Sequence, residues 1–198
     1  MPFSDTSCHG FLSRAIHAVI RERDLGAPEI LDCGIGCGIV ARVSKEVCAS
    51  ARLTGLEIFA PYVLVDEFRD LQRSNWGIYH GLYESMIIGP IADFRKALPR
   101  IDNVSYDIVV FGDSIEHVEE ADAARAIIEA RRIARHAVIV TTPLMHERAG
   151  MTYCVPQSSQ FGNDAEAHLK YWRREELEAL GLVHVGTGEL SSCFSMMV

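Results

Sequence analysis

The stretch Ile30-Leu-Asp-Cys-Gly-Ile-Gly-Cys-Gly38 decides how the rest of the chain is organised. Two apolar residues and Asp32 are followed by glycines at alternate positions, Gly34, Gly36 and Gly38. This pattern is typical of a buried strand that ends in a tight turn, where the missing side chains let another molecule approach the backbone. The sequence therefore predicts a ligand-binding turn, provided that a strand precedes it and a helix follows it.

The composition is consistent with one domain over residues 1–198. Of these 198 residues 48% are hydrophobic, which is enough for one substantial core. The formal net charge of −8 argues against non-specific attraction to nucleic acid or to an anionic membrane. Neither a membrane-spanning apolar run nor a secretion signal is found, so we expect a soluble, cytoplasmic protein.

The six cysteines are scattered along the chain, and a chain of this size needs no disulfides, so we expect reduced thiols. Cys33 and Cys37 flank the glycine turn, but no Cys or His stands nearby at zinc-ligand spacing. We interpret both as small residues that fill tight space.

Strand and helix patterns alternate on both sides of the glycine turn. Short apolar runs predict strands at 29–33, 52–58, 84–89, 106–111 and 137–141, and a closing pair at 182–186 and 192–198. Periodic apolar residues predict helices from 11 to about 26 and at 39–49, 61–74, 93–98, 119–135 and 173–179. The alternation predicts an α/β fold with a doubly wound, mostly parallel sheet, helices on both faces and an antiparallel last strand.

The spacing of the turn separates two classes of cofactor. A dinucleotide turn reads Gly-x-Gly-x-x-Gly, and this chain has Ile39 at the last of these positions. Alternate glycines after Asp32 favour S-adenosylmethionine, whose aminoacyl end lies along the glycine backbone. Glu57 ends the second predicted strand, where a carboxylate can accept hydrogen bonds from both ribose hydroxyls. A purely structural corner is the alternative, and the strand and helix around the turn count against it.

These motifs, together with Tyr106-Asp-Ile-Val-Val-Phe-Gly-Asp-Ser-Ile-Glu-His-Val118, resemble the class I S-adenosylmethionine-dependent methyltransferases. Small bacterial-type members, whose fourth strand ends in Gly-Asp-x-x-Glu-His, are the most similar. The resemblance extends through 139–143 and 162–172 and spans about residues 30–185. It implies a Rossmann-like methyltransferase fold, S-adenosylmethionine as cofactor, and a cofactor site built from Asp32, Gly34, Gly36, Gly38, Glu57, Ile91, Asp93 and Asp113.

One position departs from the family pattern. Members often have Gly-Asp-Ile after the third strand, with the Asp bonded to the adenine amino group, whereas this chain has Gly89-Pro90-Ile91. Pro90 has no side-chain acceptor and no backbone N–H. We expect Ile91 to pack on the adenine ring and Asp93 to replace the missing acid.

Three polar residues follow the fourth strand and should face the reacting end of the cofactor: Asp113, Glu116 and His117. Methyl transfer needs mainly positioning of donor and acceptor, so a general base is optional. His117 and Asp113 are the catalytic candidates, because a His or a carboxylate within reach can take the proton from an oxygen or nitrogen acceptor. In the alternative interpretation, Asp113 caps the next helix, and Glu116 or His117 holds loop backbone.

The segment 144–172 is too irregular for a helix or strand pattern and is interpreted as a lid over the acceptor pocket. Its candidate lid and substrate residues, together with Glu116, are His146, Asn163, His168 and Trp172. Trp172 is equally compatible with a core anchor, and Asn163 with a turn. A metal site built from the histidines is conceivable, but the spacing along the sequence does not support it, and we predict none.

The leading hypothesis is methyl transfer to a small-molecule or sugar-like acceptor. We expect neither nucleic acid nor membrane as partner, and the oligomeric state stays open, with a dimer among the alternatives. A methyltransferase-like binding protein without activity is a second hypothesis, because of Pro90. Nicotinamide-dependent oxidoreduction is a third, and Ile39 counts against it. The sequence does not specify the acceptor or the atom that is methylated.

Overall fold

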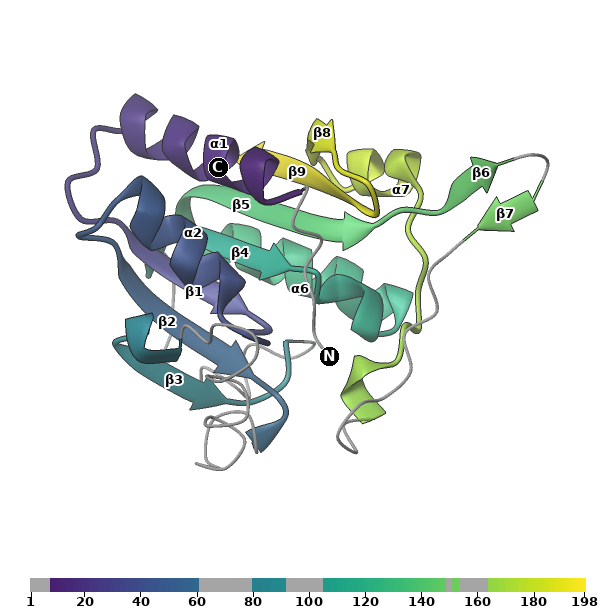
Figure 1. Ribbon diagram of the computed structural model, residues 1–198, viewed down its shortest axis with the longest axis horizontal. Coiled ribbons are helices and arrows are strands. Elements are labelled where there is room, and N and C mark those ends of the chain that lie inside the picture. The colour runs from purple at the N-terminus through teal and green to yellow at the C-terminus, as the bar shows by residue number, and fades with distance from the viewer. Residues whose placement is uncertain (1–7, 61–79, 92–104, 149–150, 154–163) are drawn as a thin grey trace.

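The computed structural model describes residues 8–60, 80–91, 105–148, 151–153 and 164–198. Within these ranges a seven-stranded sheet has the order β3-β2-β1-β4-β5-β9-β8 (Figure 1). The sheet strands are β1 (Glu29–Cys33), β2 (Arg52–Glu57), β3 (Ser85–Ile88), β4 (Tyr106–Gly112), β5 (Ala134–Pro143), β8 (Val183–Thr187) and β9 (Ser191–Met197). The helices are α1 (His9–Glu22), α2 (Ile39–Val47), α6 (Glu120–Ile133) and α7 (Arg174–Ala179), with short 3-10 helices η2 (His80–Leu82), η3 (Ile115–His117) and η4 (Asp164–Glu166).

The strand directions confirm the predicted sheet. Strands β3, β2, β1, β4 and β5 are parallel to their neighbours, whereas β9 runs antiparallel to both β5 and β8. The chain order reverses at β1, which has β2 on one side and β4 on the other. In doubly wound sheets the crevice beyond the carboxyl ends of such strands is the usual ligand site. Here this crevice is bordered by the turn after β1 and the loop after β4.

The middle of β4 shows why the apolar runs are continuous. Ile108 and Val110 pack with the residues of α1 and α2, and Val109 and Phe111 pack with those of α6 and α7. All four side chains are completely buried. Since successive strand residues point to opposite faces, both faces of the sheet are covered, as predicted. Figure 1 shows α2 and α6 on opposite sides of β4.

The predicted boundary between the helix at 119–135 and the strand at 137–141 was wrong. Helix α6 ends at Ile133, and β5 begins at once with Ala134, so Arg135 belongs to the strand and not to the end of the helix, and His136 belongs to the strand as well. Both side chains meet Asp107 of the neighbouring strand, with nitrogen–oxygen distances of 3.2 and 3.8 Å. Pairing across β4 and β5 therefore overrides the helical tendency of these charged residues.

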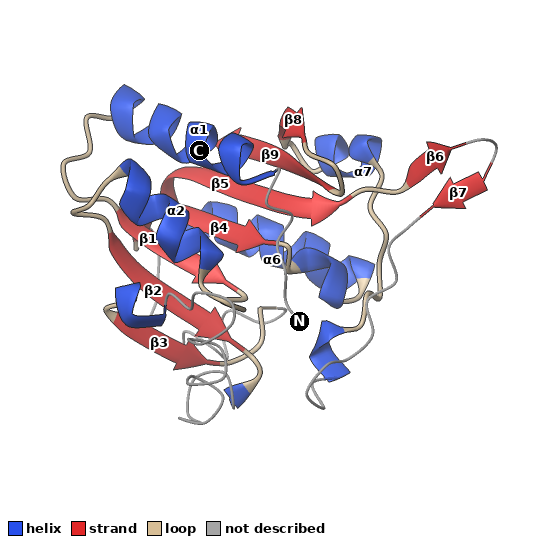
Figure 2. Cartoon of the chain, viewed as in Figure 1, coloured by secondary structure: helices blue, strands red, loops and turns tan. Residues whose placement is uncertain are grey.

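The irregular segment also contains structure that the sequence did not predict. A ribbon of two antiparallel strands, β6 (His146–Arg148) and β7 (Met151–Tyr153), extends away from the main sheet (Figure 2). The predicted helices at 61–74 and 93–98 lie outside the described residues. No helix in the described ranges is long and apolar enough to cross a bilayer.

Candidate functional site

The glycine turn lies directly against the loop that follows β4. Gly34 and Gly38 have φ angles of 91° and 79°, in the left-handed region that other residues adopt only with strain. Gly38 stands at the start of α2, and the N–H of Gly34 donates to the carbonyl of Leu56 at 2.7 Å. A Cβ atom on Gly34 would lie 2.7 Å from the Cβ of Ser114, so only glycine fits. The turn after β1 and the loop after β4 thus form one continuous surface.

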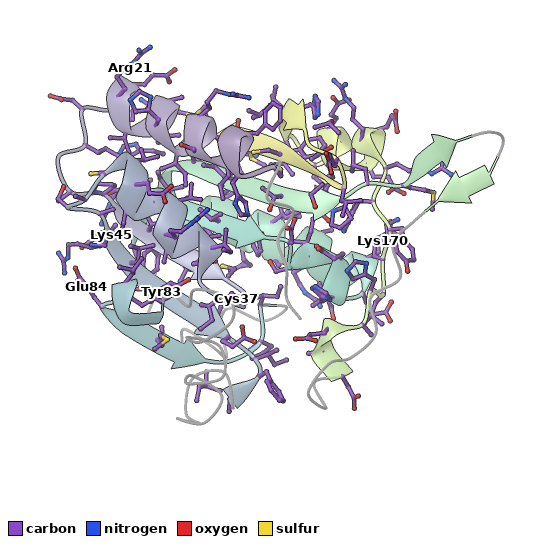
Figure 3. The ribbon with its side chains drawn as sticks, viewed as in Figure 1. Arg21, Cys37, Lys45, Tyr83, Glu84 and Lys170 are labelled. Carbon is purple, nitrogen blue, oxygen red and sulfur yellow. The ribbon has the colours of Figure 1, made fainter. Side chains whose placement is uncertain are left out.

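Asp32 is the most enclosed acid of this surface. Its side chain is completely buried, and its Oδ2 accepts a hydrogen bond from the hydroxyl of Tyr83. Its Oδ1 has no hydrogen-bond partner among the described residues. Burial raises the pKa of Asp32 to about 8, and the charge of Glu57 adds to the shift while the Tyr83 bond opposes it. Figure 3 shows Tyr83 next to η2 and Cys37 in the turn that leads into α2.

Glu57 connects the end of β2 to the glycine turn. Its Oε2 accepts the N–H of Gly36 at 3.3 Å, and its Oε1 accepts the N–H of Phe59 at 2.9 Å. Burial raises the pKa of Glu57, and the negative charge of Glu166 adds to the shift. Glu166 belongs to η4 and is itself buried. The segment after residue 163 therefore brings a further acid close to the turn.

The loop after β4 starts with a strained residue. Asp113 has a φ of 49°, which is unusual for a residue with a side chain. Its N–H donates to Thr141 at both the carbonyl, 3.0 Å, and the hydroxyl, 3.1 Å. These two bonds from β5 hold the strained turn, which directs the next residues across the carboxyl ends of the strands.

Glu116 points into the protein from this loop. Only 1% of it is exposed, and its Oε2 accepts the hydroxyl of Thr142 at 3.0 Å. Its Oε1 has no hydrogen-bond partner among the described residues. Burial raises the pKa of Glu116 well above its ordinary value, and the charge of Asp113 adds to the shift.

His117 stands beside Glu116 in a defined orientation. Its Nδ1 lies 3.3 Å from the carbonyl oxygen of Ala167, and its Nε2 lies 4.0 Å from Oε1 of Glu116. Burial lowers the pKa of His117, so the ring is mainly neutral at pH 7. The ring of His168 packs edge-on against it with centroids 4.9 Å apart, and Tyr171 packs against His168 at 5.9 Å.

The segment 164–172 is bound across the ends of β4 and β5. The carbonyl of Glu116 accepts the N–H groups of Leu169 and Lys170 at 2.8 and 3.1 Å, and the carbonyl of Trp172 accepts the N–H of Met145 at 2.8 Å. Lys170 lies near the start of α6, where its ammonium contacts Glu120 (Figure 3). This part of the predicted lid is therefore attached to the sheet by backbone bonds.

Solved structures share this architecture. No protein-family model matches the sequence, and no curated protein sequence is significantly similar to it. An S-adenosylmethionine-dependent methyltransferase from Clostridium acetobutylicum superposes with a TM-score of 0.59 at 12% identity, over 96% of this chain and 92% of that one. One from Aquifex aeolicus gives 0.56 at 14% identity, over 92% and 89% of the two chains.

The magnesium protoporphyrin IX methyltransferase of Synechocystis, solved with bound SAH, gives 0.55 at 15% identity, over 96% of this chain and 82% of that one. This chain has the class I methyltransferase fold. The predicted resemblance is confirmed at the level of the fold, and the turn after β1 and the loop after β4 occupy the switch point of this methyltransferase fold.

The methyltransferase fold brings most of the predicted site residues to one edge. The sheet's carboxyl edge gathers the acids Asp32, Glu57, Asp113 and Glu116, the glycines of the turn, and the histidines 117 and 168. Burial raises the pKa of Cys37 to about 11, in agreement with an unreactive, space-filling thiol.

The other predicted site residues lie in the core, in β6 or outside the described residues. The side chain of Trp172 is 1% exposed and belongs to the core on the α6 face, which favours the core-anchor interpretation. Ile91 packs into the same core and is 8% exposed. His146 begins β6, and its side chain is not described. Asp93 and Asn163 lie outside the described residues.

Two contributors were missed by the sequence reasoning. Tyr83 bonds Asp32 from 51 residues away, and Thr142 bonds Glu116 from the neighbouring strand. No local pattern marks such pairs, although a polar threonine at the end of an apolar strand was a signal for the second.

Proposed function

We propose that this protein is a methyltransferase that uses S-adenosylmethionine and acts on a small-molecule acceptor. The observation that carries the proposal is the set of buried acids at the carboxyl edge, Asp32, Glu57 and Glu116. Among the described residues, no lysine or arginine offsets the charge of any of them. Buried acids without a cation are costly unless a ligand compensates them. S-Adenosylmethionine carries two cationic groups, its sulfonium and its ammonium.

The residues around the turn fit the parts of this cofactor. The orphaned Oδ1 of Asp32 is an acceptor for a donor on the methionine end, and Gly34 allows close approach there. The two oxygens of Glu57 retain lone pairs for the ribose hydroxyls beyond the backbone N–H groups that they accept. Ile91 and Asp93 are proposed for the adenine end, and Asp113 for the methionine end.

The chemistry is a displacement in which the bound cofactor supplies an electrophilic methyl group. The chain's part is to bind and orient the acceptor and to exclude water. His117 presents the lone pair of Nε2, because Nδ1 donates to Ala167. This nitrogen can accept a proton from an acceptor hydroxyl or amine.

The class of acceptor is inferred from charge and from a neighbour. The net charge of −8 disfavours nucleic acid as the acceptor. The Synechocystis neighbour is named for a porphyrin, which is a small molecule. We infer a small organic or sugar-like acceptor for this chain as well.

Titration calorimetry with S-adenosylmethionine and its demethylated product tests the proposal. We expect one site in the native chain and at least about tenfold weaker binding in Asp32→Ala and Glu57→Ala. Glu84→Ala, which removes an exposed acid paired with Arg52, is the matched control and should bind as the native chain does.

Absence of binding by a folded native chain would refute the proposal. Unchanged binding by both variants would show that the cofactor site does not include Asp32 and Glu57. Binding without methyl transfer to a panel of hydroxyl and amine acceptors would favour a binding protein. A parallel titration of NADH by fluorescence tests the oxidoreductase alternative.

A further inference from the structure

Three possible metal ligands lie together between the loop after β4 and the segment 164–172. One ligand atom from each of Glu116, His117 and His168 lies within 4.8 Å of the other two. The spacing of these residues along the sequence predicted no metal site, because 117 and 168 are far apart in the chain. The loop after β4 and the segment 164–172 bring them together through the backbone bonds to Glu116.

The orientation of His117 is that of a metal ligand. A carbonyl oxygen can only accept, so the 3.3 Å contact with Ala167 places the proton of the neutral ring on Nδ1. The lone pair of Nε2 then points towards Glu116. Metal-binding histidines almost always donate their other ring N–H to a carbonyl or carboxylate in this manner.

Glu116 supplies the second acceptor. It is 1% exposed, and its Oε1 has no hydrogen-bond partner among the described residues, while Thr142 satisfies Oε2. This Oε1 faces Nε2 of His117 at 4.0 Å. A buried carboxylate oxygen and a partly buried imidazole nitrogen that face each other are stabilised by a cation or a proton between them. The charge of Asp113 nearby increases the negative potential at both groups.

We propose that Glu116, His117 and His168 bind a divalent first-row transition metal ion such as Zn²⁺ or Co²⁺. Imidazole ligands favour these ions, whereas Ca²⁺ and Mg²⁺ prefer sites made of oxygen atoms alone. Ligand atoms bound at about 2.1 Å with tetrahedral or octahedral angles lie roughly 3.0–3.4 Å apart. Rotation of each side chain by about an ångström at its end closes the triangle from its present limit of 4.8 Å.

A catalytic role for the metal extends the proposed methyl transfer and rests on that proposal. Three protein ligands leave coordination positions open for the acceptor, which is then a hydroxyl or phenol that binds through oxygen. The metal lowers the pKa of this hydroxyl, and the proton leaves to water. The oxygen lone pair forms the bond to the methyl carbon while the carbon–sulfur bond breaks and its electron pair stays on sulfur. His117 then binds the metal and does not remove the proton.

Metal titration of the full chain, without a polyhistidine tag and after removal of metals by a chelator, tests the proposal. Co²⁺ is followed by its visible absorption and Zn²⁺ by competition with Co²⁺. We expect one equivalent to bind in the native chain, and affinity at least about tenfold lower in Glu116→Gln and in His168→Gln. His168 is only partly buried, so its variant should fold even if the other does not.

His136→Gln is the matched control, because His136 also lies beside a carboxylate, with its Nε2 3.8 Å from Asp107, but this carboxylate already has Arg135. It should bind metal as the native chain does. Equal affinity in the native chain and both cluster variants would overturn the proposal, as would a thiolate charge-transfer band.

Binding of S-adenosylmethionine is measured on the same samples, with and without metal. Metal binding without cofactor binding would refute the proposed function and leave the metal site standing. Cofactor binding without metal binding would refute only the metal site.

Discussion

One buried acid lies at the start of strand β4 and another lies in the loop after its end, and the two acids have opposite surroundings. Asp107, at its start, accepts the N–H of Glu29 at 2.8 Å and pairs with Arg135 at 3.2 Å, with His136 at 3.8 Å. Glu116, beyond its end, accepts the hydroxyl of Thr142, has no cation beside it among the described residues and faces a neutral histidine. Within the described ranges, cationic side chains compensate the carboxylate of Asp107, and none compensates that of Glu116.

The difference indicates which edge of the sheet is built for stability and which for binding. A fold tolerates uncompensated polar groups mainly at functional sites, where a ligand supplies the missing interactions. The acid at the amino edge of β4 has its partners within the protein, whereas we propose that a ligand compensates the acids at the carboxyl edge. Three predictions test this contrast, in order of decreasing effect.

The largest effect is expected for Gly34→Ala at the carboxyl edge. The new Cβ would lie 2.7 Å from that of Ser114, at a φ of 91°. We expect a loss of about 3 kcal/mol or more of stability, since strain and overpacking add. Urea denaturation measures this loss. Gly10→Ala in α1, where nothing lies within 4 Å of the added atom, should instead raise stability by about 0.5–1 kcal/mol. Equal losses in both variants would contradict the packing of the turn against β4.

The second effect is a dependence of stability on pH that comes from Asp32. Its pKa is about 8 in the folded chain and near 3.8 when unfolded, so the folded state holds the extra proton between these values. The free energy of unfolding should therefore fall as pH rises from about 4 to about 8, by a few kcal/mol from this group. Denaturation at pH 5 and pH 8 measures the slope. Asp32→Asn should flatten it, and a slope unchanged in this variant would remove Asp32 as its source.

The third and smallest effect is a difference in sign between the stability changes caused by replacing Asp107 and Glu116. Asp107→Asn should lower stability by about 1 kcal/mol, because Arg135 and the N–H of Glu29 lose a charged acceptor. Glu116→Gln should leave stability unchanged or raise it by about 1 kcal/mol, because it removes a buried charge without a cation. Thermal unfolding in the presence of a chelator compares the two. A greater loss from Glu116→Gln than from Asp107→Asn would reverse the contrast between the edges.

The sequence predicted the strands well where burial on both faces imposes apolar runs. The bounds of β1 are those that were predicted, and β4 extends the prediction by one residue. The boundary between α6 and β5 was wrong because Arg135 suits a helix end by its own propensity, and its partner Asp107 is visible only in the folded sheet.

The same limit applies to the site. The positions of the glycine turn, Asp32 and Glu57 at the carboxyl edge were predictable because they follow from strands and turns that are local in the chain. The partnership of Asp32 with Tyr83, and of His117 with His168, depends on segments that only the topology brings together. Spacing along the sequence therefore did not indicate the cluster of possible metal ligands that the fold brings together.

The place of β9 has a consequence for the order of folding. This strand, which follows β8 in the chain, lies between β5 and β8. During synthesis β8 therefore emerges before the strand that joins it to the sheet, and it has no neighbour to pair with until Met197 has left the ribosome. The β5 edge is open over the same interval, so the backbone N–H and C=O groups on this edge of β5 lack their β9 partners until that strand arrives.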